Sequence, residues 1–208
     1  MRRTAKKECL DLEPKRIIFQ FIQEHPGLHL REISRKLEIP KSSLVYHINY
    51  LGKRELIVSR NGDRYKRFYV ADKFGVMEKK YLGLLQHPIN GKILLFLCLF
   101  DVRSQKQIFK FIKEGCKFDK YQTTIAFHLN NLEKKGILHR FTHGNETKYM
   151  INPKERGQLI DLIIVNKNSF FDKRLVKKIL FYMDEIPKDY IDKLVRICYD
   201  IFPHPYHV

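Results

Sequence analysis

The octapeptide LVYHINYL at residues 44–51 recurs 81 positions further along the chain as IAFHLNNL at residues 125–132. The surroundings of the two copies recur as well. Two hydroxyl residues precede each copy and two basic residues follow it, and then come a short apolar run, a turn with glycine and an aromatic-rich segment. This order predicts a helix followed by a two-stranded hairpin, formed twice in one chain. In a basic chain, such a repeat indicates two nucleic-acid-binding modules.

The positive charge follows the repeats. The chain has 208 residues and a net charge of +17. Residues 1–75 carry 17 basic and 9 acidic side chains, a net of +8; residues 76–153 carry 13 and 6, a net of +7; residues 154–208 carry 10 and 8, a net of +2. This distribution indicates a polyanionic partner that faces both repeats. General solubility of a lysine-rich protein is the alternative, but it would not favour the repeats over the tail.

The composition disfavours membrane and secreted proteins. The longest uncharged apolar run, residues 93–100, is far shorter than the ~20 residues that a membrane-spanning helix needs. The basic N-terminus is followed by ECLD instead of an apolar segment, so a secretory signal is not expected. We therefore expect a cytoplasmic protein with no membrane partner.

The residues that commonly hold metals or perform catalysis show no suitable spacing. The four cysteines (Cys9, Cys98, Cys116 and Cys198) form no C-x-x-C pair, and Cys98 lies in an apolar run that we expect in the core. The histidine pairs at 139 and 143 and at 204 and 207 fall on a strand, a loop and a proline-broken tail, which disfavours metal binding. No glycine-rich phosphate loop or G-x-S-x-G motif occurs. We expect no cofactor, no metal and no enzymatic activity.

Apolar periodicity divides the chain into five parts. We expect a basic N-terminal arm at 1–13, a first domain at 14–72, a linking helix at 73–88, a second domain at 89–152 and a C-terminal helical extension at 153–208. Asn90 is expected to cap the first helix of the second domain. The extension is apolar and nearly neutral, so it must pack either on the repeats of its own chain or against a second copy in a homodimer.

The third helix of each domain has two distinct faces. Leu44, Ile48 and Leu51 fall within ~60° of one another and are expected to face the core, as are their counterparts in the second copy. The opposite face carries hydroxyl, amide, aromatic and cationic side chains, which are the types used in major-groove recognition. No acidic residue occurs between Lys41 and Arg54. This absence favours DNA contact over an ordinary solvated helix face.

The two hairpins are expected to differ at their tips. The dipeptide Asn61-Gly62 is typical of a tight turn with positive φ at both central residues, whereas the second tip, at residues 143–145, is expected to be looser. The first tip also has more cations. We therefore expect the second repeat to bind DNA more weakly than the first, or to serve partly in assembly.

The order helix, short strand, helix, turn, helix and two-stranded wing resembles the winged helix-turn-helix fold. The sequence YHINYL at 46–51, followed by ELI at 55–57, is similar to the recognition-helix pattern of archaeal and ArsR/MarR-like regulators. The duplication resembles archaeal tandem winged-helix transcriptional regulators. The resemblance covers residues 14–151, although the turn at 115–120 is longer than its counterpart. It implies a mainly α fold with small β-wings, made of two tandem winged helix-turn-helix domains plus the C-terminal helical extension.

The resemblance also implies how double-stranded DNA would be bound, with the third helix in the major groove and the wing on the flanking backbone or minor groove. His47 and His128 flank the core side of their helices, so each either stabilises its helix or contacts a base. With the outward helix faces included, the candidate DNA-binding residues are Lys41, Ser42, Ser43, Tyr46, His47, Asn49, Tyr50, Lys53, Arg60, Arg64 and Lys66 in the first domain, and Gln122, Thr123, Phe127, Asn130, Lys134, Arg140 and Lys148 in the second.

The function expected from the sequence is that of a sequence-specific transcriptional regulator that binds double-stranded DNA. Three alternatives stay open. A replication initiator or architectural chromatin protein would share the fold and the charge. A winged-helix scaffold would bind a partner protein instead. An RNA-binding protein would stack Tyr46 and Phe127 on unpaired bases.

Overall fold

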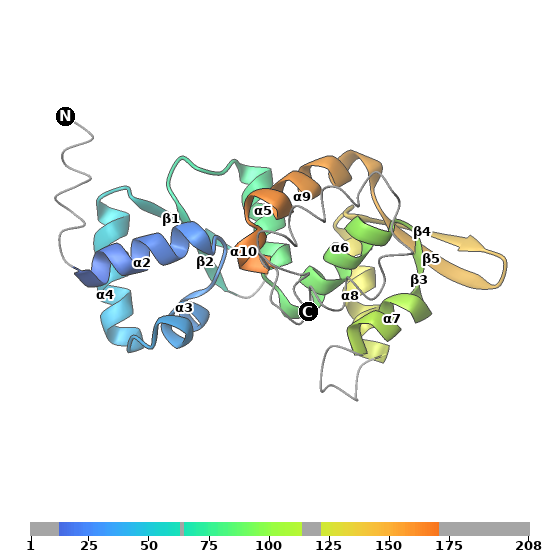
Figure 1. Cartoon of the computed structure of the whole chain (residues 1–208), viewed down its shortest axis with the longest axis horizontal. Helices are drawn as coiled ribbons and strands as arrows, with labels where there is room; N and C mark the ends of the chain where they lie inside the picture. Colours follow the sequence, from blue (N-terminus) through green and yellow to red (C-terminus); the bar gives the residue numbers. More distant parts are fainter. Residues whose placement is uncertain (1–12, 63–64, 114–121, 171–208) are drawn as a thin grey trace, which may run out of the picture. The chain divides into compact units, whose positions relative to one another are not determined.

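A computed structural model describes residues 13–62, 65–113 and 122–170 (Figure 1). Its contacts divide the chain into two units, Met1–Gln86 and His87–Val208. Both units are rich in helix and contain one small antiparallel sheet or hairpin, as the sequence predicts. Residues 1–12 of the arm predicted at 1–13, the turn at 115–120 and the part of the extension after residue 170 lie outside the described residues, as does most of the proposed homodimer surface.

The described residues of the first unit form three helices, a hairpin and a fourth helix. In chain order these are α2 (Glu13–Glu24), α3 (Leu30–Leu37), α4 (Lys41–Lys53), β1 (Ile57–Asn61), β2 (Lys66–Val70) and α5 (Val76–Leu85). An isolated bridge between His29 and Arg67 joins the segment before α3 to the hairpin. The linking helix predicted at residues 73–88 is shorter in the structure, where α5 ends at Leu85 and lies within the first unit.

The core of the first unit lies between the three helices and one side of the hairpin. Leu44, Ile48 and Leu51 of α4 are all buried in it, which confirms the predicted inward face. Ile18 of α2 and Ile33 of α3 pack in the same cluster and are fully buried. Burial of a large aliphatic side chain contributes about 1.5–3 kcal/mol. The core thus fixes which side of α4 faces outward.

Two local features set the turn that leads from α3 into α4. Glu38 adopts a left-handed conformation with φ of 56° and ends α3, while its backbone N–H donates to the Ser34 carbonyl. The Ser34 hydroxyl then donates to the Ile39 carbonyl at 2.7 Å. Pro40 directly precedes the first residue of α4, a position that suits proline because it has no N–H to leave unsatisfied at a helix start.

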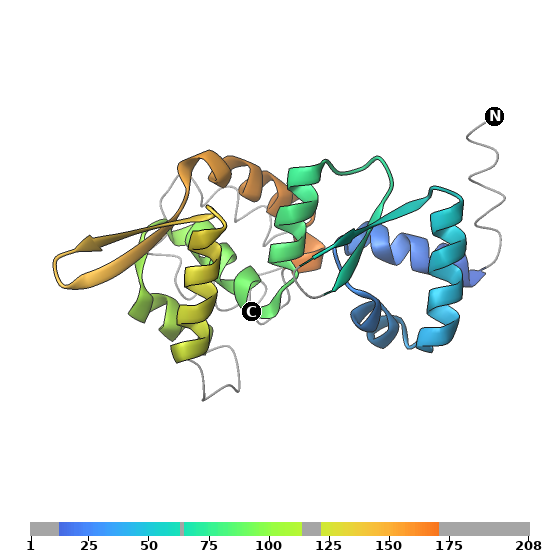
Figure 2. The ribbon, with the colours of Figure 1, turned by 180° about the vertical axis from the view of Figure 1, so that it is seen from behind.

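The second unit repeats this order of elements. It contains α6 (Pro88–Phe100), the two-residue strand β3 (Arg103–Ser104), α7 (Gln105–Lys113), α8 (Gln122–Lys134), β4 (Leu138–His143) and β5 (Glu146–Ile151), followed by α9 (Pro153–Val165) and α10 (Lys167–Phe170). The strand order is β3-β5-β4, and the β4–β5 hairpin projects beyond the helices of its unit (Figures 1 and 2). Like α4, α8 has 13 residues.

The start of α6 differs from the prediction. Asn90 was expected to cap this helix, but the cap is His87, whose Nδ1 accepts from the backbone N–H groups of Ile89 and Asn90 at 3.3 and 3.4 Å. Pro88 occupies the first turn, where its missing N–H costs nothing. Asn90 is instead buried inside the helix.

The expectation for the two hairpin turns needs correction. In the first hairpin Asn61 pairs with Lys66 and the Gly62 N–H donates to the Tyr65 carbonyl at 2.9 Å, so both predicted turn residues flank the turn, and neither has positive φ. In the second hairpin His143 pairs with Glu146, which leaves a two-residue turn whose first residue, Gly144, has φ of 60°. Glycine at this position is typical of tight hairpin turns. The second turn is therefore as short as the tight turn that was expected at the first tip, and the Asn-Gly dipeptide does not supply the central residues of the first turn.

No single helix among the described residues is long and apolar enough to cross a membrane. Helices α5 and α6 meet that criterion only when they are taken together as a bent pair.

Candidate nucleic-acid interface

The outward face of α4 is the clearest candidate surface. Opposite the buried leucines and isoleucine, the helix exposes Lys41, Ser42, Ser43, Tyr46, Asn49 and Lys53. The Tyr46 side chain is 65% exposed, which is unusual for so large a ring. No Asp or Glu occurs in α4. The face therefore combines hydroxyl, amide and cationic groups with an accessible aromatic ring and carries no opposing charge of its own.

Two predicted residues of α4 lie at the edge of this face. Tyr50 is half-buried and packs against the core, with the Lys15 ammonium 3.4 Å from its ring centroid. Lys15, on α2, is only 5% exposed, so the cation–π contact takes the place of water around its charge. His47 is also half-buried, and its Nδ1 is buried without a hydrogen-bond partner among the described groups. Both residues thus contact neighbouring parts of the protein.

The basic side chains of the hairpin in the first unit differ in exposure and in their hydrogen bonds. Lys66 is exposed beside the turn, whereas Arg64 lies outside the described residues. The Arg60 guanidinium donates to the backbone carbonyl of Val76 at the start of α5. Arg67, which the sequence did not single out as a site residue, donates to the Gly27 carbonyl at 2.6 Å. Only part of the positive charge of this wing is therefore free to face a partner.

Helix α3 adds cations that the sequence reasoning missed. Arg31, Arg35 and Lys36 are all exposed on the helix that precedes α4. Burial, followed by the charge of Lys36, lowers the pKa of His25 below its ordinary value of 6.5. The sequence does contain a signal for them, because these three cations surround the apolar position Ile33 at helical spacing. They lie outside the repeated octapeptide from which the candidate residues were chosen.

The outward face of α8 has a similar composition. Thr123, Asn130 and Lys134 are exposed, and the Phe127 side chain is 61% exposed at the position that corresponds to Tyr46. The side chain of Gln122 lies outside the described residues, although the residue begins the helix. His128 is half-buried, and its ring contacts the ring of His87, with centroids 4.7 Å apart.

The hairpin of the second unit carries fewer available cations. An Arg140 nitrogen lies 4.0 Å from a Glu133 carboxylate oxygen, with both side chains largely exposed. The Lys148 ammonium lies 3.4 Å from Nδ1 of His143. An exposed ion pair contributes about 0–1 kcal/mol to stability, but it does reduce the local positive charge. This wing therefore offers less unopposed charge than the first.

Other potentially reactive groups do not form a site. Within the described ranges, no three His, Cys, Asp or Glu side chains are placed to hold a metal ion. Cys98 is buried in α6, as the sequence predicts, and burial raises the pKa of its thiol to about 12. The thiol therefore stays protonated and unreactive at neutral pH.

These elements define a class of protein. The first unit is a helix-turn-helix domain with a β-hairpin wing, since α3, the left-handed turn at Glu38 and α4 are followed directly by the β1–β2 hairpin. Its exposed, basic and acid-free helix is the surface by which such a domain would contact nucleic acid.

Comparison with known proteins agrees with this class. Residues 13–82 match a family described as an N-terminal HTH domain, which spans α2 to the middle of α5. The chain is also 31% identical over 140 residues to an uncharacterized HTH-type transcriptional regulator of Methanocaldococcus jannaschii. The alignment covers 67% of this chain and 34% of that protein, so the chain spans about a third of its relative.

Proposed function

We propose that this protein is a transcriptional regulator that binds specific sequences in double-stranded DNA through two winged-helix modules. The observation that carries the proposal is the outward face of α4, which is exposed, basic and free of acidic residues. The helix-turn-helix match and the similarity to a protein named as an HTH-type transcriptional regulator support it.

In this proposal α4 lies in the major groove. Asn49 would contact a base edge, because its amide has both a donor and an acceptor, as recognition of adenine requires. Lys41, Lys53 and Lys66 would contact phosphates, together with the cations of α3. Such contacts carry little sequence information but supply most of the affinity. Arg60 has donors left for a phosphate, since a guanidinium has five N–H groups and one contacts Val76.

The second unit would bind a neighbouring part of the same DNA. Thr123, Asn130 and Lys134 repeat the chemistry of the first helix, which supports a second module. The Glu133–Arg140 pair removes part of its positive charge, so we expect a weaker contribution. Two linked modules would still gain from effective concentration, because binding of the first keeps the second close to the DNA.

The exposed rings of Tyr46 and Phe127 favour a second candidate function, binding of single-stranded RNA. Aromatic side chains on a surface stack on unpaired bases, and each stacked base contributes about 1–3 kcal/mol. A competition between duplex DNA and unstructured RNA distinguishes the two functions. Regulation of transcription predicts that the duplex wins at physiological salt.

The decisive experiment selects bound duplexes from a random DNA pool at about 0.15 M salt and then measures affinity across a range of salt concentrations. A shared sequence motif is the expected result, and its length shows whether one unit or both contact bases. Steep salt dependence without a motif would instead indicate an architectural or replication protein. No duplex binding at all would refute the proposal.

A further inference from the structure

The wing of the first unit is fastened to α5 along one side of that helix. Tyr69 of β2 donates from its hydroxyl to the Lys79 carbonyl at 2.8 Å, and Arg60 of β1 donates to the Val76 carbonyl. Gly83 lies one turn further along, where the side chains of Arg67 and Tyr69 approach the helix. Positions 76, 79 and 83 share one helix face, because their spacing is i, i+3 and i+7.

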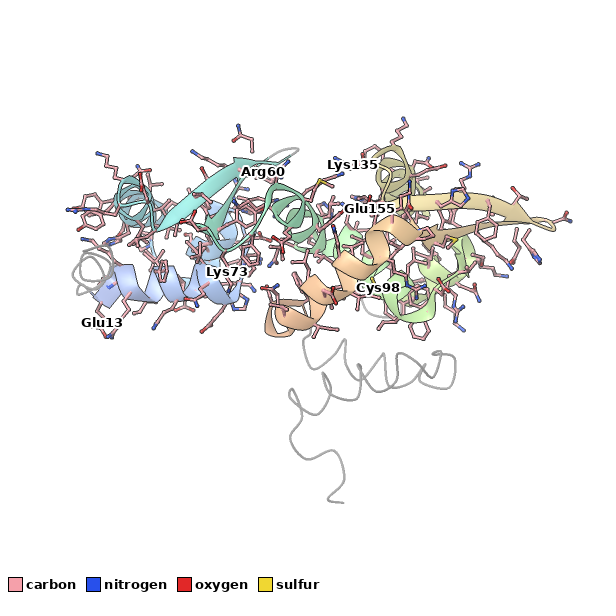
Figure 3. All side chains as sticks on the ribbon, turned by 90° about the horizontal axis from the view of Figure 1, so that it is seen from above. Glu13, Arg60, Lys73, Cys98, Lys135 and Glu155 are labelled. Carbon is pink, nitrogen blue, oxygen red and sulfur yellow. The ribbon has the colours of Figure 1, made fainter. Side chains whose placement is uncertain are left out.

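A single side of the hairpin makes all of these contacts. Arg60 pairs with Arg67 across the strands and Val58 pairs with Tyr69, so these four side chains share a face. Ile57 and Phe68, on the opposite face, belong to the core cluster. The hairpin is therefore held between the core and α5, and Figure 3 shows Arg60 next to the ribbon of α5.

Two details indicate that the arrangement is specific. Directly opposed arginines repel each other in a sheet, but here each guanidinium donates to a backbone carbonyl, one at Val76 and the other at Gly27. Glycine inside a helix costs about 0.5–1 kcal/mol relative to alanine. Gly83 nevertheless occupies α5, where a Cβ would lie 3.2 Å from Cδ of Arg67 and 3.5 Å from the Tyr69 hydroxyl.

We propose that α5 is a positioning element for DNA binding, and that Tyr69, Arg67 and Gly83 set where the wing meets the DNA backbone. The proposal rests on the proposed function. Tyr69 is only 1% exposed and its ring lies under α5, so it does not itself contact a ligand at the surface. Its burial also raises the pKa of the phenol, which keeps the hydroxyl protonated as the donor to Lys79.

In this proposal α5 fixes the angle at which the β1–β2 hairpin projects from the first unit. Exposed Lys66 begins β2 beside the turn, at the opposite end of the hairpin from the Ile57–Val70 pair. A small rotation of the strands displaces such a tip far more than their base. Contacts of α5 with Arg60 near the turn and with Tyr69 near the other end of the hairpin prevent that rotation, so the wing approaches the duplex in one position. Loss of the constraint costs phosphate contacts even though every phosphate-binding side chain is retained.

The test compares Gly83→Leu with a matched substitution, Gly157→Leu in α9. Leucine favours a helix more than glycine at both sites, but a Cβ at Gly157 meets nothing within 4 Å, whereas one at Gly83 displaces Arg67. Tyr69→Phe is the second variant, since it removes only the hydroxyl. Thermal unfolding first establishes the temperature range in which all variants are folded.

For Gly83→Leu and Tyr69→Phe we expect duplex affinity to fall by about 3- to 10-fold and the salt slope to decrease by about one phosphate equivalent, with Gly157→Leu unchanged. Lower thermal stability with wild-type affinity and slope would overturn the inference. Hydrogen exchange of residues 57–62 and 65–70 in the free protein provides a readout without DNA. Faster exchange in Gly83→Leu is expected, and unchanged exchange would overturn the inference even if the wild type binds no duplex.

Discussion

Substitution of Asn49 and of Lys53 should separate base recognition from phosphate contact on one helix. Both side chains are exposed on the same face of α4, four residues apart. Exposed substitutions of this kind change folding stability by no more than about 0.5 kcal/mol, so any change in binding reports the interface. Asn49→Ala should weaken binding to the selected sequence by about 1–3 kcal/mol, which is roughly 5- to 150-fold, with little change for a scrambled duplex.

Lys53→Ala should behave differently. Loss of one phosphate contact lowers affinity for every duplex to a similar extent and reduces the salt slope by about 0.9. Fluorescence anisotropy of labelled specific and scrambled duplexes, measured at four or more salt concentrations, gives both quantities. The reasoning would be refuted if Asn49→Ala weakened both duplexes equally, or if it altered the salt slope while Lys53→Ala did not.

Three further predictions concern stability and reactivity. Leu44→Ala should destabilise the first unit by about 2–5 kcal/mol in urea unfolding, because Leu44 is fully buried, whereas Val45→Ala, at a 38% exposed position, should have little effect. Burial lowers the pKa of His29 below 6.5, so the folded state disfavours protonation of this histidine. The contribution of neutral His29 to the free energy of unfolding should be fully present above pH 6.5 and should be lost as the pH falls below that value. His29→Asn, which retains an acceptor for the Glu32 N–H at the start of α3, should reduce this loss of stability at low pH. Cys98 should resist iodoacetamide at pH 8 in the folded protein and react in denaturant, as peptide mass spectrometry can show.

The sequence contained enough information for the helices and for the orientation of α4. Leu44, Ile48 and Leu51 recur at helical spacing, and burial of that stripe leaves only one side free. The exposure of Tyr46, Asn49 and Lys53 then follows from geometry alone. Periodicity is reliable in α2, α3 and α4 because each of them buries a single stripe of its surface, whereas α6 is buried at every position from Ile93 to Phe100.

The hairpin turns and the cap of α6 show where local signals are insufficient. The Asn61-Gly62 dipeptide favours a tight turn, but the register of the strands places Asn61 in a pair with Lys66. The register of β1 and β2 depends on which side chains pack against the core and against α5, and a short stretch of sequence does not contain this information. At α6 the cap is His87, three residues before the predicted Asn90, and Pro88 favours a helix start directly after that histidine. Tertiary packing decided the first case, and a neighbouring residue decided the second.

The contacts of α5 were invisible in the sequence for a related reason. In the sequence alone, Gly83 is a residue that destabilises a helix, and Arg60 and Arg67 are two more cations on a basic wing. Only the pairing of the two strands shows that both arginines face the same side as Tyr69. The number of basic residues therefore overestimates how many cations of the wing are available to a polyanion, since the guanidinium groups of Arg60 and Arg67 each donate to a backbone carbonyl within the unit.

The two units also differ in how much of their positive charge is available to a polyanion. The repeated helices have equal lengths and expose aromatic rings at corresponding positions. Their charges are not equivalent, because α4 has no acidic residue whereas Glu133 of α8 lies beside the arginine of its own wing. Phosphate contacts dominate affinity for DNA, and an acid at the interface repels the backbone. Under the proposed two-module function, we therefore expect the first unit to provide most of the affinity for DNA and the second to contribute less.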